Sequence, residues 1–247
     1  THYVIMATKK GQVKKTSLEQ YSRPRSNGIN AITIKDDDEL LEAKLSDGQS
    51  HILMAAQSGK CIHFPEEKVR PMGRTAAGVR GMTTAGPEDE LVGMVVVNKE
   101  EMEEYNILVV SEQGYGKRSD IEDYRITNRG GKGVKTISIT DKTGQLIAIK
   151  AVKDDNDLMI INKSGITIRM HVDAMRVMGR NTQGVRLIKL GKNDEIAAVA
   201  KVTKEEDEEE LTYDEDGNVI EASTEDGAAE DTSSEEGDAN EEESSEE

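Results

Sequence analysis

An eleven-residue string occurs twice in this sequence and constrains the fold more than any other feature. It reads Arg-Pro-Met-Gly-Arg-Thr-Ala-Ala-Gly-Val-Arg over residues 70–80 and Arg-Val-Met-Gly-Arg-Asn-Thr-Gln-Gly-Val-Arg over residues 176–186. The copies start 106 residues apart and agree in register at Arg, Met-Gly-Arg and Gly-Val-Arg. A match of this length predicts a repeat architecture, and the period of the repeat then decides the fold.

Regularly spaced glycines divide the distance between the two strings into two periods. Each unit has a turn glycine after its first apolar run and a second glycine 17 or 19 residues later. Successive turn glycines lie 48, 55 and 51 residues apart, which gives four units of about fifty residues, the period of propeller blades. The turn glycines are Gly11, Gly59, Gly114 and Gly165, and the later glycines are Gly28, Gly78, Gly133 and Gly184.

Each unit contains apolar runs that are short enough, and sufficiently interrupted by Gly, Asp and Pro, to predict strands rather than helices. The third run of each unit is expected as a strand at 29–34, 79–82, 134–139 and 185–190. We therefore expect an all-β fold of the β-propeller or β-pinwheel kind, with blades near 1–48, 49–104, 105–154 and 155–204. A β-solenoid is the alternative, although it prefers shorter periods, and a helical turn at 69–72 or 172–178 stays open.

The formal net charge of −17 is unevenly placed along the chain. Residues 205–247 contain 22 Asp or Glu and no Lys or Arg, so residues 1–204 hold 32 basic and 27 acidic residues. Low hydrophobicity with high charge predicts that 205–247 is a disordered acidic tail, within which only 213–220 has a turn signal for transient folding. A polyanionic tail next to a basic body is expected to compete with a polyanion for that body, and the alternative is a solubilising tail.

No pattern in the chain indicates catalysis, a metal site or a membrane segment. Cys61 is the one cysteine, which fits a reducing cytoplasm, and the longest apolar run, near 91–97, is too short to cross a bilayer. Cys61 and His63 lie two residues apart, but a zinc site needs about four ligands, so both are expected to be structural. The chain begins with Thr1 in mid-pattern, which suggests a fragment or a processed product.

Basic residues recur at equivalent places in the units. If the units are related by rotation about a ring axis, these residues form a band around the rim, which would hold the phosphates of bent double-stranded DNA without reading bases. The alternative is an ordinary solvated surface. The candidate DNA-binding residues are Lys14, Lys15, Arg23, Arg25, Arg70, Arg74, Arg80, Lys117, Arg118, Arg129, Lys132, Arg169, Arg176, Arg180 and Arg186.

The stretch Asn128–Gly133, Asn-Arg-Gly-Gly-Lys-Gly, is the candidate phosphate-binding loop. Its glycines let the backbone approach a phosphate closely, and its Arg and Lys supply positive charge. It lacks the spacing of a Walker A loop. A flexible basic turn is the alternative interpretation.

Several of these strings together resemble the C-terminal domain of the bacterial DNA gyrase A subunit, and the resemblance covers essentially all of 1–204. It implies a β-pinwheel with strand exchange between blades and an outer rim that wraps DNA, which lets the complete enzyme introduce negative supercoils with ATP. The strings are Met6-Ala7-Thr8, Val13-Lys14-Lys15-Thr16, the two Met-Gly-Arg…Gly-Val-Arg motifs, Gly114-Tyr115-Gly116-Lys117-Arg118 and Gly179–Val185.

The resemblance also implies where the remaining chemistry lies. The cleavage tyrosine belongs to the N-terminal part of the A subunit, whereas ATP and Mg²⁺ belong to the partner B subunit, so no cofactor and no catalytic residue is expected here. Expected partners are DNA and the rest of an A2B2 complex in the bacterial cytoplasm. The family places the box Gln-Arg-Arg-Gly-Gly-Lys/Arg-Gly in its first blade, whereas this chain matches most of it at Arg129, Gly130, Gly131, Lys132 and Gly133, and is expected to begin at the third blade. The related subunit of topoisomerase IV and a protein-interaction propeller whose acidic tail recruits basic partners are the alternatives.

Overall fold

The computed structural model describes residues 2–191 and 194–203, together with the backbone of two short strands farther along the chain. The chain divides into two units, residues 1–204 and 205–247. In the second unit, β16 (Thr212–Tyr213) pairs antiparallel with β17 (Val219–Ile220), which overlaps the stretch 213–220 that was expected to fold transiently. The predicted disorder of the remaining tail falls outside the described residues.

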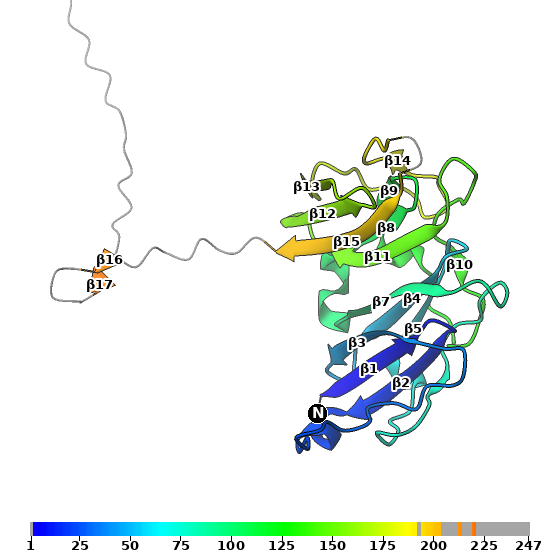
Figure 1. The fold of residues 1–247 in the computed structure, drawn as a ribbon, viewed down its shortest axis with the longest axis vertical. Helices are drawn as coiled ribbons and strands as arrows, with labels where there is room; N and C mark the ends of the chain where they lie inside the picture. The colour runs from blue at the N-terminus through cyan, green and yellow to red at the C-terminus, as the bar shows by residue number, and fades with distance from the viewer. Residues whose placement is uncertain (1, 192–193, 204–211, 214–218, 221–247) are drawn as a thin grey trace, which may run out of the picture. The chain divides into compact units, whose positions relative to one another are not determined.

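The first unit is all-β, as predicted, and consists of four antiparallel sheets that follow the chain (Figure 1). Sheet A has the order β3 (Leu40–Ser46), β1 (Tyr3–Thr8), β2 (Gln12–Ser17) and β6 (Val79–Arg80). Sheet B has the order β7 (Leu91–Val97), β4 (His51–Ala56), β5 (Lys60–Pro65) and β10 (Val134–Lys135). Sheet C has the order β11 (Leu146–Val152), β8 (Asn106–Ser111), β9 (Tyr115–Asp120) and β14 (Val185–Arg186). Sheet D has the order β15 (Ile196–Thr203), β12 (Asn156–Asn162) and β13 (Thr167–His171).

Strands are exchanged between consecutive repeats, as the resemblance implied. The outer strands β6, β10 and β14 come from the second, third and fourth repeats but complete sheets A, B and C. Each is two residues long, shorter than predicted, because the chain turns away directly afterwards. After β6, for example, the amides of Gly81 and Met82 both donate to the Gly11 carbonyl at the neighbouring hairpin turn.

One strand prediction is wrong. Residues 29–34 form no strand, whereas their equivalents in the later repeats pair with the sheet of the preceding repeat, and sheet A is the first sheet of the described residues. Sheet D has three strands among the described residues, and its outer strand β13 carries no added strand there. Among the described residues, strand exchange therefore leaves residues 29–34 without a sheet to complete and leaves β13 without an added outer strand.

The hydrophobic core lies between neighbouring sheets rather than inside each one. On β4, Ile52 and Met54 pack toward sheet A, whereas Leu53 and Ala55 pack toward sheet C. A third cluster joins sheets C and D. Strands buried on both faces need nearly continuous apolar sequence, which explains why the first run of each repeat is the most apolar.

Short 3-10 turns connect the strands. They are η1 (Leu18–Tyr21), η2 (Glu66–Lys68), η3 (Lys99–Glu104) and η4 (Ile121–Asp123). The segments 69–72 and 172–178, whose conformation the sequence left open, contain no helix. In the described residues, no helix has the length and apolarity that crossing a membrane requires.

Candidate nucleic-acid interface

The two arginine motifs and the equivalent stretch of the third repeat form three loops that we call exchange loops. Loop 2 (residues 70–80), loop 3 (residues 125–135) and loop 4 (residues 176–186) each lie against the second strand of the preceding sheet and end in its exchanged strand. At the base of each loop, Gly78, Gly133 or Gly184 has φ between 70° and 92°. A Cβ there would lie 2.4–2.7 Å from a carbonyl oxygen of the covered strand, so only glycine permits this docking.

The structure contradicts the prediction that Lys14 and Lys117 contact DNA. Both side chains are buried beneath an exchange loop. The Lys14 ammonium donates to the carbonyls of Ala31 and Arg74. The Lys117 ammonium donates to the carbonyls of Gly179, at 2.6 Å, and Arg180. These lysines hold the loops in place, because each satisfies carbonyls that face inward.

Burial lowers the pKa of both ammonium groups. Desolvation, followed by the charge of Arg180, lowers the pKa of Lys117 to about 8. Burial and then the charge of Arg74 lower the pKa of Lys14. A buried ammonium costs free energy even when it is hydrogen-bonded, so both positions favour the neutral form more than free lysine does.

The same correction applies to the next residue of each strand. Lys15 is buried and forms an ion pair with Glu66 of the second repeat. Arg118 is buried, donates from Nε to the Met175 carbonyl and pairs with Asp154. Both side chains therefore fasten one repeat to another, and duplex DNA approaching from solvent does not reach them.

The arginine in the middle of each loop links that loop to the preceding repeat. Arg129 donates from Nε to the Lys68 carbonyl at 2.9 Å and from Nη1 to the Arg80 carbonyl at 3.1 Å. Arg180 makes the matching pair of bonds one repeat later, to the carbonyls of Asp123 and Lys135. Arg74 donates to the Asn30 carbonyl, which is the equivalent of Arg80. These three half-buried guanidinium groups fix the spacing between loops.

In the first three repeats, a hydroxyl residue five positions after the closing glycine makes a second link, which was not foreseen from the sequence. Thr83 donates from its amide to the Gly131 carbonyl at 2.9 Å and from its hydroxyl to the Gly130 carbonyl at 2.8 Å. Thr33 and Ser138 bind loops 2 and 4 at the equivalent carbonyls. Alignment of the four repeats would have revealed this position, because three of the four units carry Thr or Ser there.

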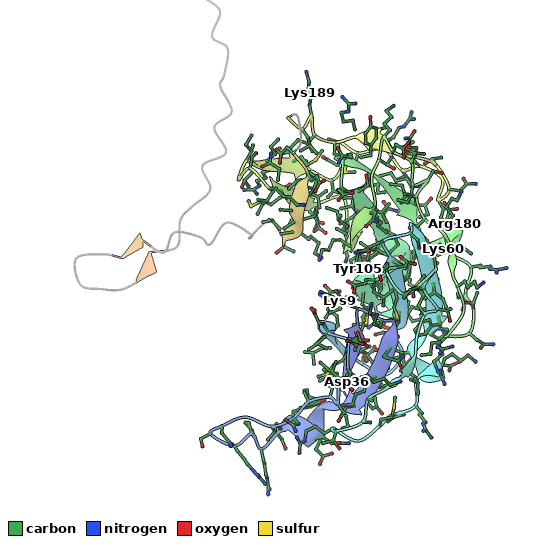
Figure 2. The ribbon with its side chains drawn as sticks, turned by 45° about the vertical axis from the view of Figure 1, so that its right-hand side comes forward. Lys9, Asp36, Lys60, Tyr105, Arg180 and Lys189 are labelled. Carbon is green, nitrogen blue, oxygen red and sulfur yellow. The ribbon has the colours of Figure 1, made fainter. Side chains whose placement is uncertain are left out.

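The first and last positions of the loops are exposed, and they recur. The first position is Arg70, Arg125 or Arg176, and the last is Arg80, Lys135 or Arg186. Lys135 is not among the residues predicted from the sequence, although the same alignment would supply it. Arg186 donates to the Tyr115 hydroxyl at 2.9 Å. Figure 2 shows Arg180, between these two positions of loop 4, at the margin of the sheets near Lys60.

The four remaining candidates lie outside the first and last loop positions. Arg23 and Arg25 are exposed in the first repeat, whose segment covers no sheet. Lys132 is exposed in loop 3. Arg169 lies on β13 and pairs with the buried Asp157 at 2.6 Å. Burial alone would raise the pKa of Asp157, but the bonds from Arg169 and His171 lower it overall.

Loop 3, the box-like loop, differs in conformation from loops 2 and 4. Gly130 has a φ of 84°, and its amide donates to the Gly81 carbonyl at 2.6 Å. A hollow of about 240 Å³ lies beside the loop, lined in part by Arg125, Asn128 and Lys132. The arrangement offers amide and cationic groups at one place on the surface, which is the chemistry that a phosphate accepts.

Cys61 and His63 have structural surroundings. Cys61 is buried in the core between sheets B and C, and burial raises the pKa of its thiol. His63 bonds through one ring nitrogen to the Tyr124 carbonyl at 2.7 Å and through the other to His51 at 2.8 Å. One ring nitrogen of His63 therefore holds the start of loop 3, and the other links β5 to β4 within sheet B.

The family model described as the DNA gyrase C-terminal domain, β-propeller, matches residues 2–47, 50–98, 105–153 and 156–203. The DNA gyrase A subunit of Staphylococcus aureus (strain MRSA252) is 44% identical over 224 residues, which cover 91% of this chain and 25% of that protein. The chain thus spans about a quarter of the length of such curated relatives.

Two solved structures share the fold. A DNA gyrase A C-terminal domain matches with a TM-score of 0.70 and 24% identity, over 81% of this chain and 65% of that one. The C-terminal domain of a DNA topoisomerase IV matches with a TM-score of 0.75 and 22% identity, over 82% of this chain and 62% of that one. The matching sequence segments coincide with the four sheets and their exchange loops, and the chain belongs to the family of DNA gyrase C-terminal domains with a β-propeller fold.

Proposed function

We propose that this chain is the DNA-wrapping module of a DNA gyrase A subunit, where it supports ATP-dependent negative supercoiling by the complete enzyme. The observation that carries the proposal is the double row of exposed basic residues on the exchange loops. Each middle arginine hydrogen-bonds its loop to the preceding repeat, so the exposed charges recur at equivalent loop positions from sheet to sheet. A periodic row of cations binds the phosphates of a bent duplex without reading its sequence. The row consists of Arg70, Arg125 and Arg176 at the first position and Arg80, Lys135 and Arg186 at the last.

The proposal gives the loop interior and the loop surface different roles. The side chains of Lys14, Lys117 and the middle arginines donate hydrogen bonds to backbone carbonyls, so these residues support the loops. The exposed rows contact DNA. Lys132 and Arg125 beside the hollow of loop 3 add a local phosphate contact. We expect the module to work in an A2B2 complex in the bacterial cytoplasm, with the rest of the A subunit, with its second copy, and with the two B subunits. ATP and Mg²⁺ would bind elsewhere in that complex.

Gyrase is preferred to topoisomerase IV because the curated relatives at 44% identity are gyrase A subunits. The topoisomerase IV structure supports the shared fold, at an identity too low to decide function. Wrapping is the property that would separate the two assignments.

The test is duplex binding by the whole chain, titrated across salt, with a triple variant of the first position: Arg70→Gln, Arg125→Gln and Arg176→Gln. Removing three phosphate contacts should lower the slope of log K against log salt by about 2.7, at about 0.9 per phosphate. The matched control removes three exposed lysines outside the exchange loops, Lys44, Lys99 and Lys163, and should leave the slope near its original value.

DNA wrapping is measured separately from binding, as a change in plasmid linking number. A relaxed plasmid that is wrapped by the chain and then treated with a type I topoisomerase should keep a changed linking number after the protein is removed. The loop variant should lose this change and the lysine control should retain it. Binding with equal slopes in both variants would overturn the role of the rows, and binding without a linking-number change would overturn wrapping.

A further inference from the structure

The second position of each exchange loop holds an exposed apolar residue. It is Pro71 in loop 2, Ile126 in loop 3 and Val177 in loop 4. Ile126 is 56% and Val177 is 44% exposed, although isoleucine and valine are among the residues most often buried in folded proteins. Single apolar residues at the surface are ordinary, but an exposed apolar residue at the same position of three equivalent loops indicates a shared role.

Recurrence distinguishes these residues from other strongly exposed apolar side chains. Leu45 on β3 is 63% exposed, but its position is taken in sheet B by Val96, which is half-buried, and in sheet D by Lys201. Ile166 follows the hairpin glycine of the fourth repeat, where the second repeat carries Lys60. Neither position is apolar and exposed throughout the repeats, so neither indicates a role that the repeats share.

The backbone at the second position is fixed to the strand that the loop covers. In each loop, the second position forms a β-bridge with one strand residue, and the amide that follows donates to the carbonyl of that same residue. The donor and acceptor pairs are Met72 with Lys15 at 2.8 Å, Thr127 with His63 at 2.8 Å and Met178 with Arg118 at 2.9 Å. The three apolar side chains therefore project from anchored backbone rather than from free turns.

The three side chains are compact and rigid. Isoleucine and valine are branched at Cβ, which restricts χ1, and the proline ring is closed on the backbone. Such side chains lose little conformational entropy when they enter a tight space. Small apolar side chains of this kind are what DNA-bending proteins insert between base pairs from the minor groove.

An exposed arginine, Arg70, Arg125 or Arg176, precedes each of these residues. In loop 3, Arg125 and Thr127 line the hollow of about 240 Å³, and Ile126 lies between them in the sequence. Successive side chains of extended backbone point in opposite directions, so Ile126 points away from that hollow. Loop 3 thus presents a cation suited to a phosphate and, next to it, an apolar group directed elsewhere.

Duplex DNA is the partner that fits this combination of charge and apolar surface. Protein partners favour a contiguous apolar patch, whereas these residues stand singly in three loops and each follows an arginine. A duplex offers phosphates to the arginines, and a base step that opens toward the minor groove offers apolar base faces to the neighbouring side chains. Charge complementarity therefore favours DNA over a protein groove.

We propose that Pro71, Ile126 and Val177 are wedge residues, which enter the minor groove of bent double-stranded DNA and partly unstack one base step at each loop. The inference rests on the proposed wrapping function and adds to it a preference among DNA sequences. Unstacking is easiest at pyrimidine–purine steps, so the favoured substrate is a duplex in which such steps face the loops at each helical turn. The preceding arginines bind the phosphates beside the opened steps.

The test measures sequence preference by the whole chain and by its triple variant Pro71→Ala, Ile126→Ala and Val177→Ala. One duplex carries TA steps about every 10 base pairs, and the other carries uninterrupted A-tracts in their place. The wild type should bind the first duplex at least about tenfold more tightly, which is what one altered base pair costs many specific sites. In the triple variant this ratio should fall below about threefold, whereas the salt slope should match that of the wild type because every arginine is retained.

Unstacking is measured directly with a fluorescent adenine analogue at the central TA step, because such analogues brighten when they leave the base stack. Binding of the wild type should brighten the analogue, and binding of the triple variant should leave it dim. The matched control removes three apolar side chains outside the exchange loops, Leu18→Ala, Leu45→Ala and Ile166→Ala, and should retain both the preference and the brightening. All six substituted residues are exposed, so unchanged melting temperatures are expected and check the fold.

The outcomes separate the wedge from wrapping itself. If the wild type changes the linking number of a plasmid but shows no preference for TA steps, or shows a preference and a brightening that the triple variant keeps, the wedge is overturned and wrapping stands. If the wild type neither binds nor wraps a duplex, both proposals are overturned. Self-association of the wild type that the triple variant loses, without a change in sequence preference, would assign the three residues to a protein contact instead.

Discussion

Sheets C and D are neighbours built from equivalent strands, yet the second strand of one is buried and that of the other is exposed. On β9, Lys117 is 1% and Arg118 is 7% exposed beneath loop 4. On β13, the equivalent residues Ile168 and Arg169 lie at the surface. The difference comes from the next repeat, which covers sheet C and has no counterpart for sheet D among the described residues. Whether a strand residue is core or surface is thus decided by the following repeat rather than by the strand itself.

The largest expected difference between the two sheets lies at their hairpin glycines. Gly114 and Gly165 both have positive φ, of 76° and 88°. A Cβ at Gly114 would lie 2.8 Å from Ile188 of the covering repeat, whereas a Cβ at Gly165 meets nothing within 4 Å. We expect Gly165→Ala to cost about 1 kcal/mol of unfolding free energy, for the backbone conformation alone. Gly114→Ala should cost about 3 kcal/mol or more, because the contact adds overpacking strain.

Denaturant unfolding of the two single variants measures the difference directly. Gly28→Ala serves as a further control, since Gly28 has a φ of 80° and open space around its Cβ position. Equal losses at Gly114 and Gly165 would show that the covering repeat does not press on the hairpin turn.

Lys117→Met removes the ammonium beneath loop 4 while keeping an unbranched side chain of similar length. The carbonyls of Gly179 and Arg180 then lose their donor, which should cost about 2 kcal/mol. Ile168→Met, at the equivalent exposed position of sheet D, should change stability by less than about 0.5 kcal/mol. Chemical denaturation gives both values, and hydrogen exchange should accelerate in loop 4 of the first variant alone.

The lowered pKa of Lys117 adds a pH signature to that comparison. Its pKa in the folded chain is about 8, against an ordinary value of 10.5. Between these two values Lys117 binds more protons in the unfolded chain than in the folded one, so its contribution to stability should rise with pH across this window. Because Met does not titrate, the gap between wild type and Lys117→Met should widen as pH increases from 8 to 10.5. A constant gap would indicate that Lys117 is not desolvated.

The sequence predicted the repeats and the turn glycines because both recur at a visible period. For the same reason, the sequence predicted that four recurring basic residues lie on the exposed rim. This prediction was wrong for Lys14, Lys15, Lys117 and Arg118, which are buried. A lysine that recurs at a fixed position can be a recurring surface charge or a recurring internal link, and periodicity does not distinguish them. The deciding information is that a loop about sixty residues later, such as Gly179–Arg180 over Lys117, docks on that strand.

The smallest expected effect is a difference in the salt slope of duplex binding between variants of two exposed arginines, one without an ion-pair partner among the described residues and one with such a partner. Arg176 is exposed at the first position of loop 4, and no ion pair engages it among the described residues, whereas Arg169 is paired with the buried Asp157 at 2.6 Å. Arg176→Gln should lower the salt slope of duplex binding by about 0.9, the value for one phosphate contact. Arg169→Gln should leave the slope unchanged, because contacting DNA would require Arg169 to leave a buried carboxylate. His171 still bonds to Asp157 in that variant, so the fold should persist, as a thermal melt can verify. An equal decrease at both arginines would place sheet D within the DNA-binding row and remove the distinction between covered and uncovered sheets.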